Sequence, residues 1–221
     1  MKTNSLQKKT GKGRPKAQAG ESKRECILDS ALFLFAKHGV SETTVVQIAE
    51  KSGVTSAMVH YYFKNWDGLL DTIMVERIVP KVEYVWNGIE NITTVQEILK
   101  IFIDRFFKVM EEEPLFPELW NREIFNAGGN FRERFVKYYP VKKLQTVQRI
   151  FIKAQQNGQI NPQLQVTHIL VSAVGLVIFP LIAHDLLSPL LKLSAIDKEK
   201  YKQHVLTILE NGLYVTKGNQ Q

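Results

Sequence analysis

The segment between residues 44 and 64 gathers side chains that can contact nucleic acid. Ser56 can hydrogen-bond a base or a phosphate, while Ala57 and Met58 can make apolar contact with a thymine methyl group. Side chains that can donate hydrogen bonds or a positive charge follow them: His60, Tyr61, Tyr62 and Lys64. This combination predicts contact with a DNA groove, because both base edges and phosphates find partners.

Two short helices are expected to position these side chains. Thr44-Val45-Val46-Gln47 is a capping-box pattern that opens the first helix, and Thr55 can cap the second, which runs to about Tyr62. Gly53 permits the positive φ of a tight turn, and Val54 can fill the gap between the helices. The spacing is typical of a helix-turn-helix. The alternative is an ordinary αα-hairpin in a bundle, although its core would not require the polar run of His and two Tyr.

Residues 24 to about 73 resemble the N-terminal domain of the TetR family of bacterial repressors. The matching residues fit one register: Ile27, Ala31, Phe35, Gly39, Thr44, Ile48-Ala49, Gly53-Val54, Tyr62-Phe63 and Leu69-Leu70. The combined pattern Ile-Ala-x-x-x-Gly-Val followed by Tyr-Tyr-Phe-Lys-Asn is specific, but it covers about a quarter of the chain. The remainder is similar to the family in length and helicity only.

The resemblance implies a DNA contact at each of these positions. Thr44 would hold a phosphate at the start of the helix that its capping box opens. The residues that would face base edges, next to the cap Thr55, are Ser56, Ala57 and Met58. Lys64 would contact the DNA backbone, and Tyr61 lies at a DNA-facing position. His60 stands where the family usually has a phosphate-binding Tyr, and Tyr62 where it often has His.

Two positions depart from the family pattern. Val46 stands where many members carry a polar residue or Arg that reads a base, which favours apolar readout or none. Trp66 replaces the common Lys at the start of the fourth helix, although its indole N–H could still bond a phosphate. Because one cationic contact is lost, we expect affinity to depend more on the N-terminal arm and to be salt-dependent.

The net charge of +7 lies at the N-terminus. Residues 1–24 hold eight of the 29 Lys and Arg residues and one of the 22 acidic residues, so the remainder is neutral. Residues 1–21 are interpreted as a flexible basic arm that suits a polyanion. Within it, Lys12-Gly13-Arg14-Pro15-Lys16 is similar to an AT-hook core, in which Arg14 would enter a narrow minor groove. A tail with only nonspecific affinity is the alternative.

The whole chain is expected to be all-α. Residues 22–80 would form the helix-turn-helix domain, from a capping box at Ser22 to a fourth helix that runs from Trp66 to Pro80 or beyond. Residues 81–221 would form a helical effector-binding and dimerisation domain. Its helices are expected from Thr94 to Pro114, over 116–126, from Asn130 to Asn157 with an interruption at Pro140, from Pro162 to Leu187, and from Asp197 onward.

A small-molecule effector is implied by the resemblance. The side chains that could line its cavity are Trp86, Phe102, Phe106, Met110, Trp120, Phe125, Phe179 and His184. Each of them could instead be ordinary core. Such a lining suits an apolar or aromatic effector better than a highly charged one. His168 and His184 are too isolated to indicate a metal site, and no cofactor is expected.

The resemblance also implies a homodimer. The two last long helices, over 162–187 and 197–216, would form a four-helix bundle across a two-fold axis and present two recognition helices to a palindromic operator in double-stranded DNA. Effector binding would change the spacing of those helices and lower DNA affinity. The resemblance favours repression over activation.

Other functional classes find little support. We find no Gly-rich phosphate loop, metal-ligand cluster or nucleophile motif, so an enzyme is not expected. The uncharged run Ile169–Ala183 is shorter than the ~20 residues of a membrane span and contains Pro180, so a buried core helix is expected there. One cysteine, Cys26, is compatible with the cytoplasm. The main alternative is a constitutive, architectural DNA-binding protein without an effector.

Overall fold

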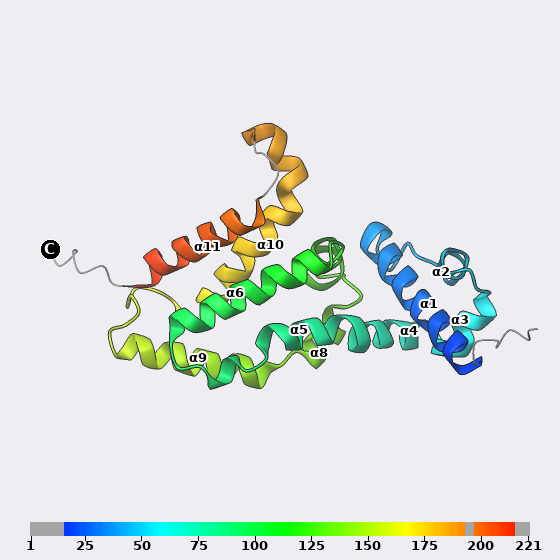
Figure 1. The fold of residues 1–221 in the computed structure, drawn as a ribbon, viewed down its shortest axis with the longest axis horizontal. Coiled ribbons are helices and arrows are strands. Elements are labelled where there is room, and N and C mark those ends of the chain that lie inside the picture. Colours follow the sequence, from blue (N-terminus) through cyan, green and yellow to red (C-terminus); the bar gives the residue numbers. More distant parts are fainter. Residues whose placement is uncertain (1–15, 193–196, 215–221) are drawn as a thin grey trace, which may run out of the picture.

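The computed structural model describes residues 16–192 and 197–214, and these form helices joined by short turns, with no strand among them. One long helix and two short ones form a unit at one end of the molecule, and a helical body lies at the other (Figure 1). The all-α class predicted from the sequence is confirmed, because the described residues form only helices, turns and loops.

The N-terminal unit consists of α1 (Lys16–His38), α2 (Val45–Ser52) and α3 (Ser56–Phe63). Its core is made by fully buried side chains such as Ile27, Phe35 and Ile48. α1 begins six residues before Ser22, because the helix formers that follow Pro15 extend it toward the N-terminus. The predicted capping box at Ser22 is therefore wrong, and residues 16–21 belong to a helix rather than to the arm. Arg14 and the rest of the AT-hook-like segment before residue 16 lie outside the described residues.

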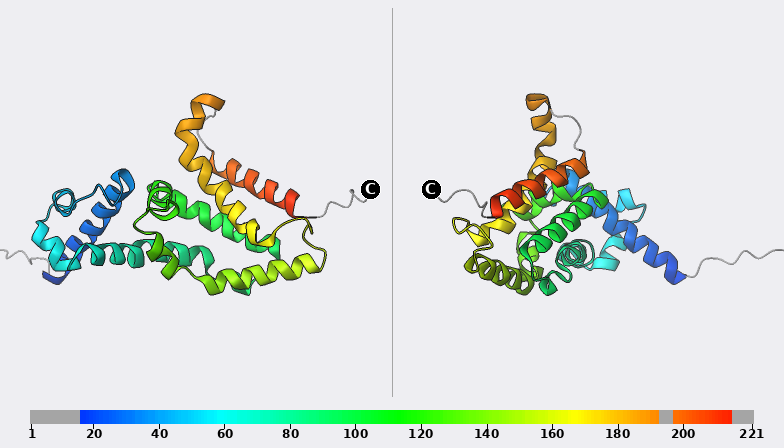
Figure 2. Two further views of the ribbon diagram at one scale, coloured as in Figure 1. Left: turned by 180° about the vertical axis from the view of Figure 1, so that it is seen from behind. Right: turned by 60° about the vertical axis from the view of Figure 1, so that its left-hand side comes forward.

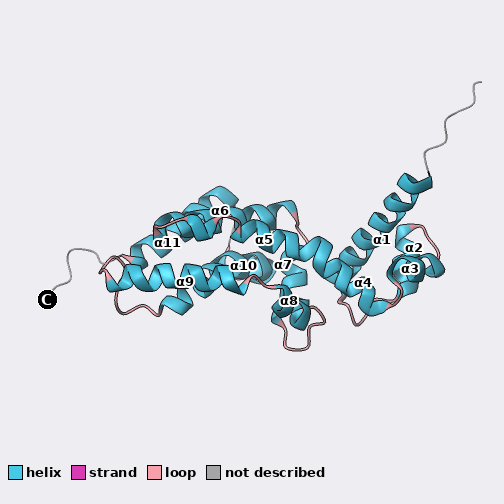
Figure 3. Ribbon diagram, turned by 90° about the horizontal axis from the view of Figure 1, so that it is seen from below, coloured by secondary structure: helices cyan, strands magenta, loops and turns pink. Residues whose placement is uncertain are grey.

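One nearly continuous helix leads from this unit into the body (Figure 3). It comprises α4 (Trp66–Ile73), a π-helical stretch η1 (Met74–Ile78) and α5 (Val79–Trp86). Pro80 stands in the first turn of α5, where its missing N–H is tolerated, and the wider turn before it lets the helix continue. The helix predicted to run past Pro80 is confirmed.

The body is built on α6 (Val95–Glu112), which Thr94 caps as predicted by accepting a hydrogen bond from the Glu97 N–H. A 3₁₀ turn η2 (Ile89–Asn91) precedes it, and α7 (Phe116–Leu119) and the π-helical η3 (Trp120–Phe125) follow it. The predicted helix from Asn130 is two separate helices, α8 (Arg132–Tyr138) and α9 (Val141–Gln156), because Pro140 stands between them.

The two last helices are α10 (Val166–Leu191) and α11 (Lys198–Leu213), and Asp197 caps α11 as predicted. α10 does not begin at Pro162. Residues 161–165 form a turn, in which the Gln155 amide donates to the Asn161 and Leu164 carbonyls and the Asn161 N–H donates to the Leu213 carbonyl. The far end of α10 projects beyond α11, away from the body (Figure 2).

α10 is less buried than the sequence analysis expected. By length and composition it could cross a membrane, and 28% of its most apolar 18-residue window is buried. One side packs on the body through residues such as Ala173 and Val177. The opposite side exposes Phe179, Leu186 and Leu190. The expectation of a buried core helix is wrong for that side, since no other part of the described chain covers it.

Candidate functional site

The turn between α2 and α3 has the geometry that the sequence predicted. The Thr44 hydroxyl accepts from the Gln47 N–H while the Thr44 N–H donates to the Gln47 side chain at 2.7 Å, which completes a capping box. Gly53 has a φ of +67°, a region that favours glycine, and ends α2. The Thr55 hydroxyl accepts from the Met58 N–H and caps α3. These local bonds fix the start of α3 relative to α2.

The outer face of α3 carries most of the residues expected to meet DNA. Val59 and Phe63 are buried and four residues apart, so they mark its inner face. The outer stripe has the same helical spacing and consists of Ser56, Ala57, His60, Tyr61 and Lys64. Tyr61 is 81% exposed, and its ring contacts only that of Tyr62 edge-on among the described aromatic rings, with centroids 5.3 Å apart. The stripe is therefore available to a partner.

The other predicted contact residues differ in exposure. Thr44 and Thr55 are exposed beside the two helix starts, and Val46 is 63% exposed on α2. Met58 and Tyr62 are half-buried, and Tyr62 packs against the core. Trp66 is also half-buried: its ring meets Phe35 edge-on, with centroids 5.6 Å apart. Trp66 thus contributes to the packing of the unit, a role that its position at a helix start did not reveal.

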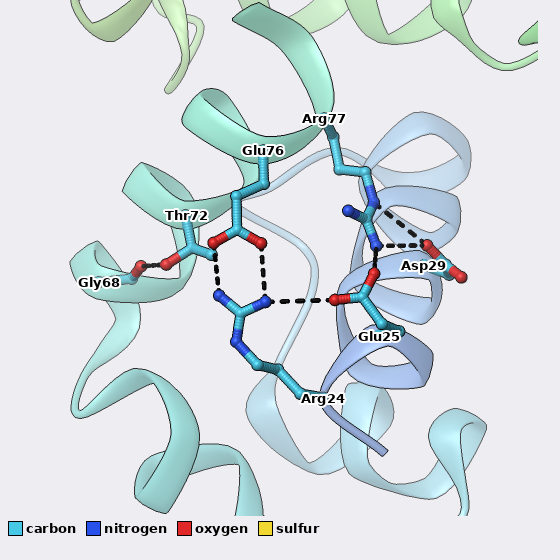
Figure 4. Close-up of polar contacts among 7 residues, drawn as sticks. All are labelled: Arg24, Glu25, Asp29, Gly68, Thr72, Glu76 and Arg77. Carbon is cyan, nitrogen blue, oxygen red and sulfur yellow. Dashed lines mark hydrogen bonds and ion pairs between the residues drawn. The ribbon is translucent and has the colours of Figure 1, made fainter. Parts of the chain in front are cut away.

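An ion-pair network holds α1 against the helix that leads to the body (Figure 4). The Arg24 guanidinium donates two hydrogen bonds to Glu76, at 2.7 and 2.5 Å. Arg77 bonds Glu25 and also Asp29, the latter at 3.1 Å. The hydrogen bond from Arg24 lowers the pKa of the Glu76 carboxyl, and the same bond raises the pKa of Arg24. The network fixes the orientation of the N-terminal unit on η1.

A cavity of about 500 Å³ lies in the body between α5, α6, η3, α8, α9 and α10. Six of the eight residues proposed for it line this space: Trp86, Phe102, Phe106, Met110, Trp120 and Phe125. The other two do not. Phe179 lies on the exposed side of α10 with 62% of its surface accessible, and His184 lies one to two turns farther along that helix. Residue type alone predicted both, and in a helix that is apolar on all sides it does not indicate which residues face the body.

Sequence reasoning missed the polar residues of the cavity. They are Lys81, Tyr139, Gln148 and Thr167. Burial raises the pKa of the Tyr139 phenol to about 12, so the hydroxyl remains protonated near neutral pH and can act as a hydrogen-bond donor. The described residues contain no group of three or more His, Cys, Asp or Glu that could hold a metal ion.

The wall of the cavity is bonded directly to the N-terminal unit. Glu123 lies in η3 between the cavity residues Trp120 and Phe125, and it is 3% exposed. Its carboxylate accepts hydrogen bonds from the Val40 N–H at 2.9 Å and the Asn130 N–H at 3.0 Å. Val40 follows the end of α1, so a single buried side chain joins the two parts of the molecule.

Gly39 allows this close approach. Its φ is +86°, and a Cβ atom there would lie 3.1 Å from Arg122 Cδ and 3.2 Å from Glu123 Oε1. A second link runs from α8, where Arg134 donates to Asp71 at 2.6 Å and to Asp67 at 2.7 Å on α4. Arg134 is the neighbour of Phe135, which lines the cavity. η3 and α8 are therefore each hydrogen-bonded to the N-terminal unit or to the helix that leads from it.

Known proteins share both the motif and the fold. Residues 27–73 match the family model described as "Bacterial regulatory proteins, tetR family". The chain is also 25% identical over 173 residues to the "Probable acrEF/envCD operon repressor" of Escherichia coli (strain K12), across 73% of this chain and 75% of that protein. The chain thus carries the N-terminal helix-turn-helix domain of the TetR family. The family consists of transcriptional regulators rather than enzymes.

Solved structures of transcriptional regulators show the same fold over most of the chain. The transcriptional regulator FadR from Bacillus subtilis, in complex with stearoyl-CoA, has a TM-score of 0.64 at 20% identity and covers 86% of this chain and 100% of that one. The ketosteroid transcriptional regulator KstR2 of Mycobacterium tuberculosis has a TM-score of 0.66 at 16% identity and covers 92% of this chain and 98% of that one. At these identities the likeness concerns the fold.

Proposed function

We propose that this chain is a cytoplasmic, homodimeric repressor of the TetR family that binds a palindromic operator and releases it when a small apolar molecule fills the cavity. The observation that carries the proposal is the bonded path from the cavity wall to the helix-turn-helix, through Glu123 and Val40 at 2.9 Å. A DNA-binding unit and a ligand-sized apolar cavity on one chain need such a path if one is to control the other.

The DNA contact would be made by α3 and the starts of α2 and α4. The N-terminal part of α3 presents small side chains, Ser56 and Ala57, which let the helix enter a major groove closely. The later part presents His60, Tyr61 and Lys64, which can bond phosphates. Trp66 is half-buried, so a phosphate contact at the start of α4 would be made by its indole N–H or by neighbouring backbone N–H groups.

A dimer would form through α10 and α11. The exposed apolar side of α10, together with Ile208 on α11, forms a face that water covers in the single chain. Burying it against a second copy across a two-fold axis removes it from water. The same symmetry would place two copies of α3 on half-sites of a palindrome, one turn of DNA or a multiple of it apart.

The effector would act through the wall of the cavity. Seven aromatic residues line it, so an apolar or aromatic body fits, and relatives named for ketosteroid regulation or solved with stearoyl-CoA support this class. Filling the space displaces η3 and α8, which carry Glu123 and Arg134. The effector favours the released state only by binding it more tightly than the DNA-bound state.

Selection of bound duplexes from a random DNA pool, at two salt concentrations, tests the proposal. A regulator of this kind enriches a palindrome whose half-site spacing reports the distance between the two α3 helices. Binding without enrichment at either salt concentration would instead favour a constitutive, architectural DNA-binding protein, in which charge provides the affinity.

A further inference from the structure

The charge on the cavity wall has one sign. Among the described residues that line the cavity, Lys81 is the only charged side chain, and no carboxylate is among them. The rest of the lining is apolar apart from the hydroxyl groups of Tyr139 and Thr167 and the amide of Gln148. A ligand that enters this space therefore meets an apolar surface and one cationic side chain, which is paired with an acid outside the lining. This asymmetry selects among ligands by the charge of their polar end.

The Lys81 ammonium is held by acids that remain in contact with water. Its Nζ atom lies 2.9 Å from Glu113 Oε1 and 4.0 Å from Glu112 Oε2, at the end of α6. The Glu113 side chain is 35% exposed and that of Glu112 is 50% exposed. If Lys81 changes its partner, water solvates the acid that it leaves, so no unpaired charge remains buried. Lys81 can therefore turn to another carboxylate at little cost.

Resting on the effector role proposed above, we infer that the effector is an amphiphile with one carboxylate, that is, an aliphatic or aromatic acid. Its body lies against Trp86, Phe106 and Trp120, and its carboxylate replaces Glu113 as the partner of Lys81. A cationic amphiphile meets Lys81 and finds no acid on the wall. A neutral one gains from apolar burial only.

Lys81 is also well placed for such a ligand to have an effect. It follows Pro80 in the first turn of α5, directly after the π-helical η1 that joins this helix to α4. Wider π turns are frequent at functional sites, and prolines are common at kinks. A carboxylate that draws Lys81 away from the end of α6 therefore acts on the helix that carries the DNA-binding unit.

The test compares dodecanoate, dodecanol and dodecylammonium, each below its micelle concentration, as ligands of the purified full chain. Trp86 and Trp120 line the cavity, so their fluorescence reports occupancy. We expect dodecanoate to bind about tenfold more tightly than dodecanol, as for one added charged hydrogen bond, and dodecylammonium to bind most weakly. Lys81→Met should abolish the preference for dodecanoate and keep the affinity for dodecanol.

Two further variants make the result decisive. Lys108→Met is the matched control, since Lys108 lies 3.8 Å from the same Glu112 but does not line the cavity, and it should keep the preference. Glu113→Gln removes the competing acid and should tighten dodecanoate binding severalfold, an effect that no loss of folding imitates. Equal binding of all three probes overturns the inference and leaves the effector cavity standing. If none of them changes the fluorescence, both the inference and the proposed effector role fail.

Discussion

The Glu123 carboxylate and the Val40 backbone N–H form a buried hydrogen bond of 2.9 Å between the wall of the cavity and the end of α1. The same carboxylate also accepts from the N–H of Asn130, at 3.0 Å, and from its side-chain amide, at 3.2 Å. Each backbone donor has its acceptor in this one side chain. The junction between the two parts of the chain thus depends on a group that no apolar residue can replace.

Replacing this carboxylate should destabilise the chain strongly. We expect Glu123→Leu to lower the free energy of unfolding by about 2 to 4 kcal/mol, because the N–H groups of Val40 and Asn130 lose their acceptor inside the protein. Denaturant unfolding measures the change. The matched control is Glu118→Gln, which breaks an exposed ion pair with Lys37 across the same α7–α1 contact and should cost less than about 1 kcal/mol. Equal effects of the two variants would contradict the importance of the buried bond.

The outer stripe of α3 should provide both specificity and salt dependence. Lys64→Gln should weaken binding to all duplexes alike and reduce the slope of log affinity against log salt by about 1, the value for one lost phosphate contact. Lys100→Gln, an exposed lysine on α6, serves as the control and should leave the slope unchanged. Fluorescence anisotropy across a salt series gives both slopes. An unchanged slope for Lys64→Gln would remove that residue from the interface.

The exposed side of α10 should hold the dimer together. Phe179→Asp should convert the dimer to a monomer, because it places a charge in a face that must be desolvated on association. Val136→Asp is the matched control: Val136 is 67% exposed and Phe179 62%, but Val136 lies on α8, away from that face. Sedimentation velocity distinguishes the two species. A dimer that survives Phe179→Asp and dissociates with Val136→Asp would place the interface elsewhere.

The Arg24–Glu76 pair should make the stability of the N-terminal unit fall in acid. Because Arg24 lowers the pKa of Glu76 in the folded state, the pair stabilises the fold above the ordinary glutamate pKa. That stability is lost as the pH falls through the lowered value. Glu76→Gln should cost at most about 1 kcal/mol at neutral pH, since both side chains are partly exposed, and nothing in strong acid. Thermal melts across pH measure this, with the exposed Glu133→Gln as control; a constant difference at all pH values would contradict it.

The helix-turn-helix could be predicted because its signals are local. Thr44, Gly53 and Thr55 each act within four residues of their own position, as caps or as the turn, and the structure has these bonds. The start of α10 was misplaced for the opposite reason. There the Gln155 amide and the Leu213 carbonyl hold residues 161–165 in a turn, and both belong to other helices. A proline at a typical helix start does not reveal such distant partners.

The cavity could be predicted only in part. Phe102 and Phe106 could be predicted because amphipathic spacing marks the inner face of α6, whereas Trp86, Trp120 and Phe125 were predicted by residue type alone. The position of Phe179 could not be predicted, because α10 is apolar on every face and its sequence does not indicate which face packs on the body. The roles of Lys81 and Glu123 could not be predicted. Lys81 lies where the start of α5 meets the end of α6, and Glu123 accepts a hydrogen bond from a residue 83 positions away in the sequence.

The most direct test of the whole account is to follow DNA release and cavity occupancy in one titration. The Trp66→Phe variant of the full chain, whose remaining tryptophans Trp86 and Trp120 both line the cavity, is bound to its selected duplex. The dodecyl probe that binds most tightly is added while duplex anisotropy and tryptophan fluorescence are recorded. We expect the duplex to be released over the same concentration range in which the tryptophan signal changes, and the duplex to weaken probe binding by the same factor. A cavity that fills while the duplex remains bound would contradict the account.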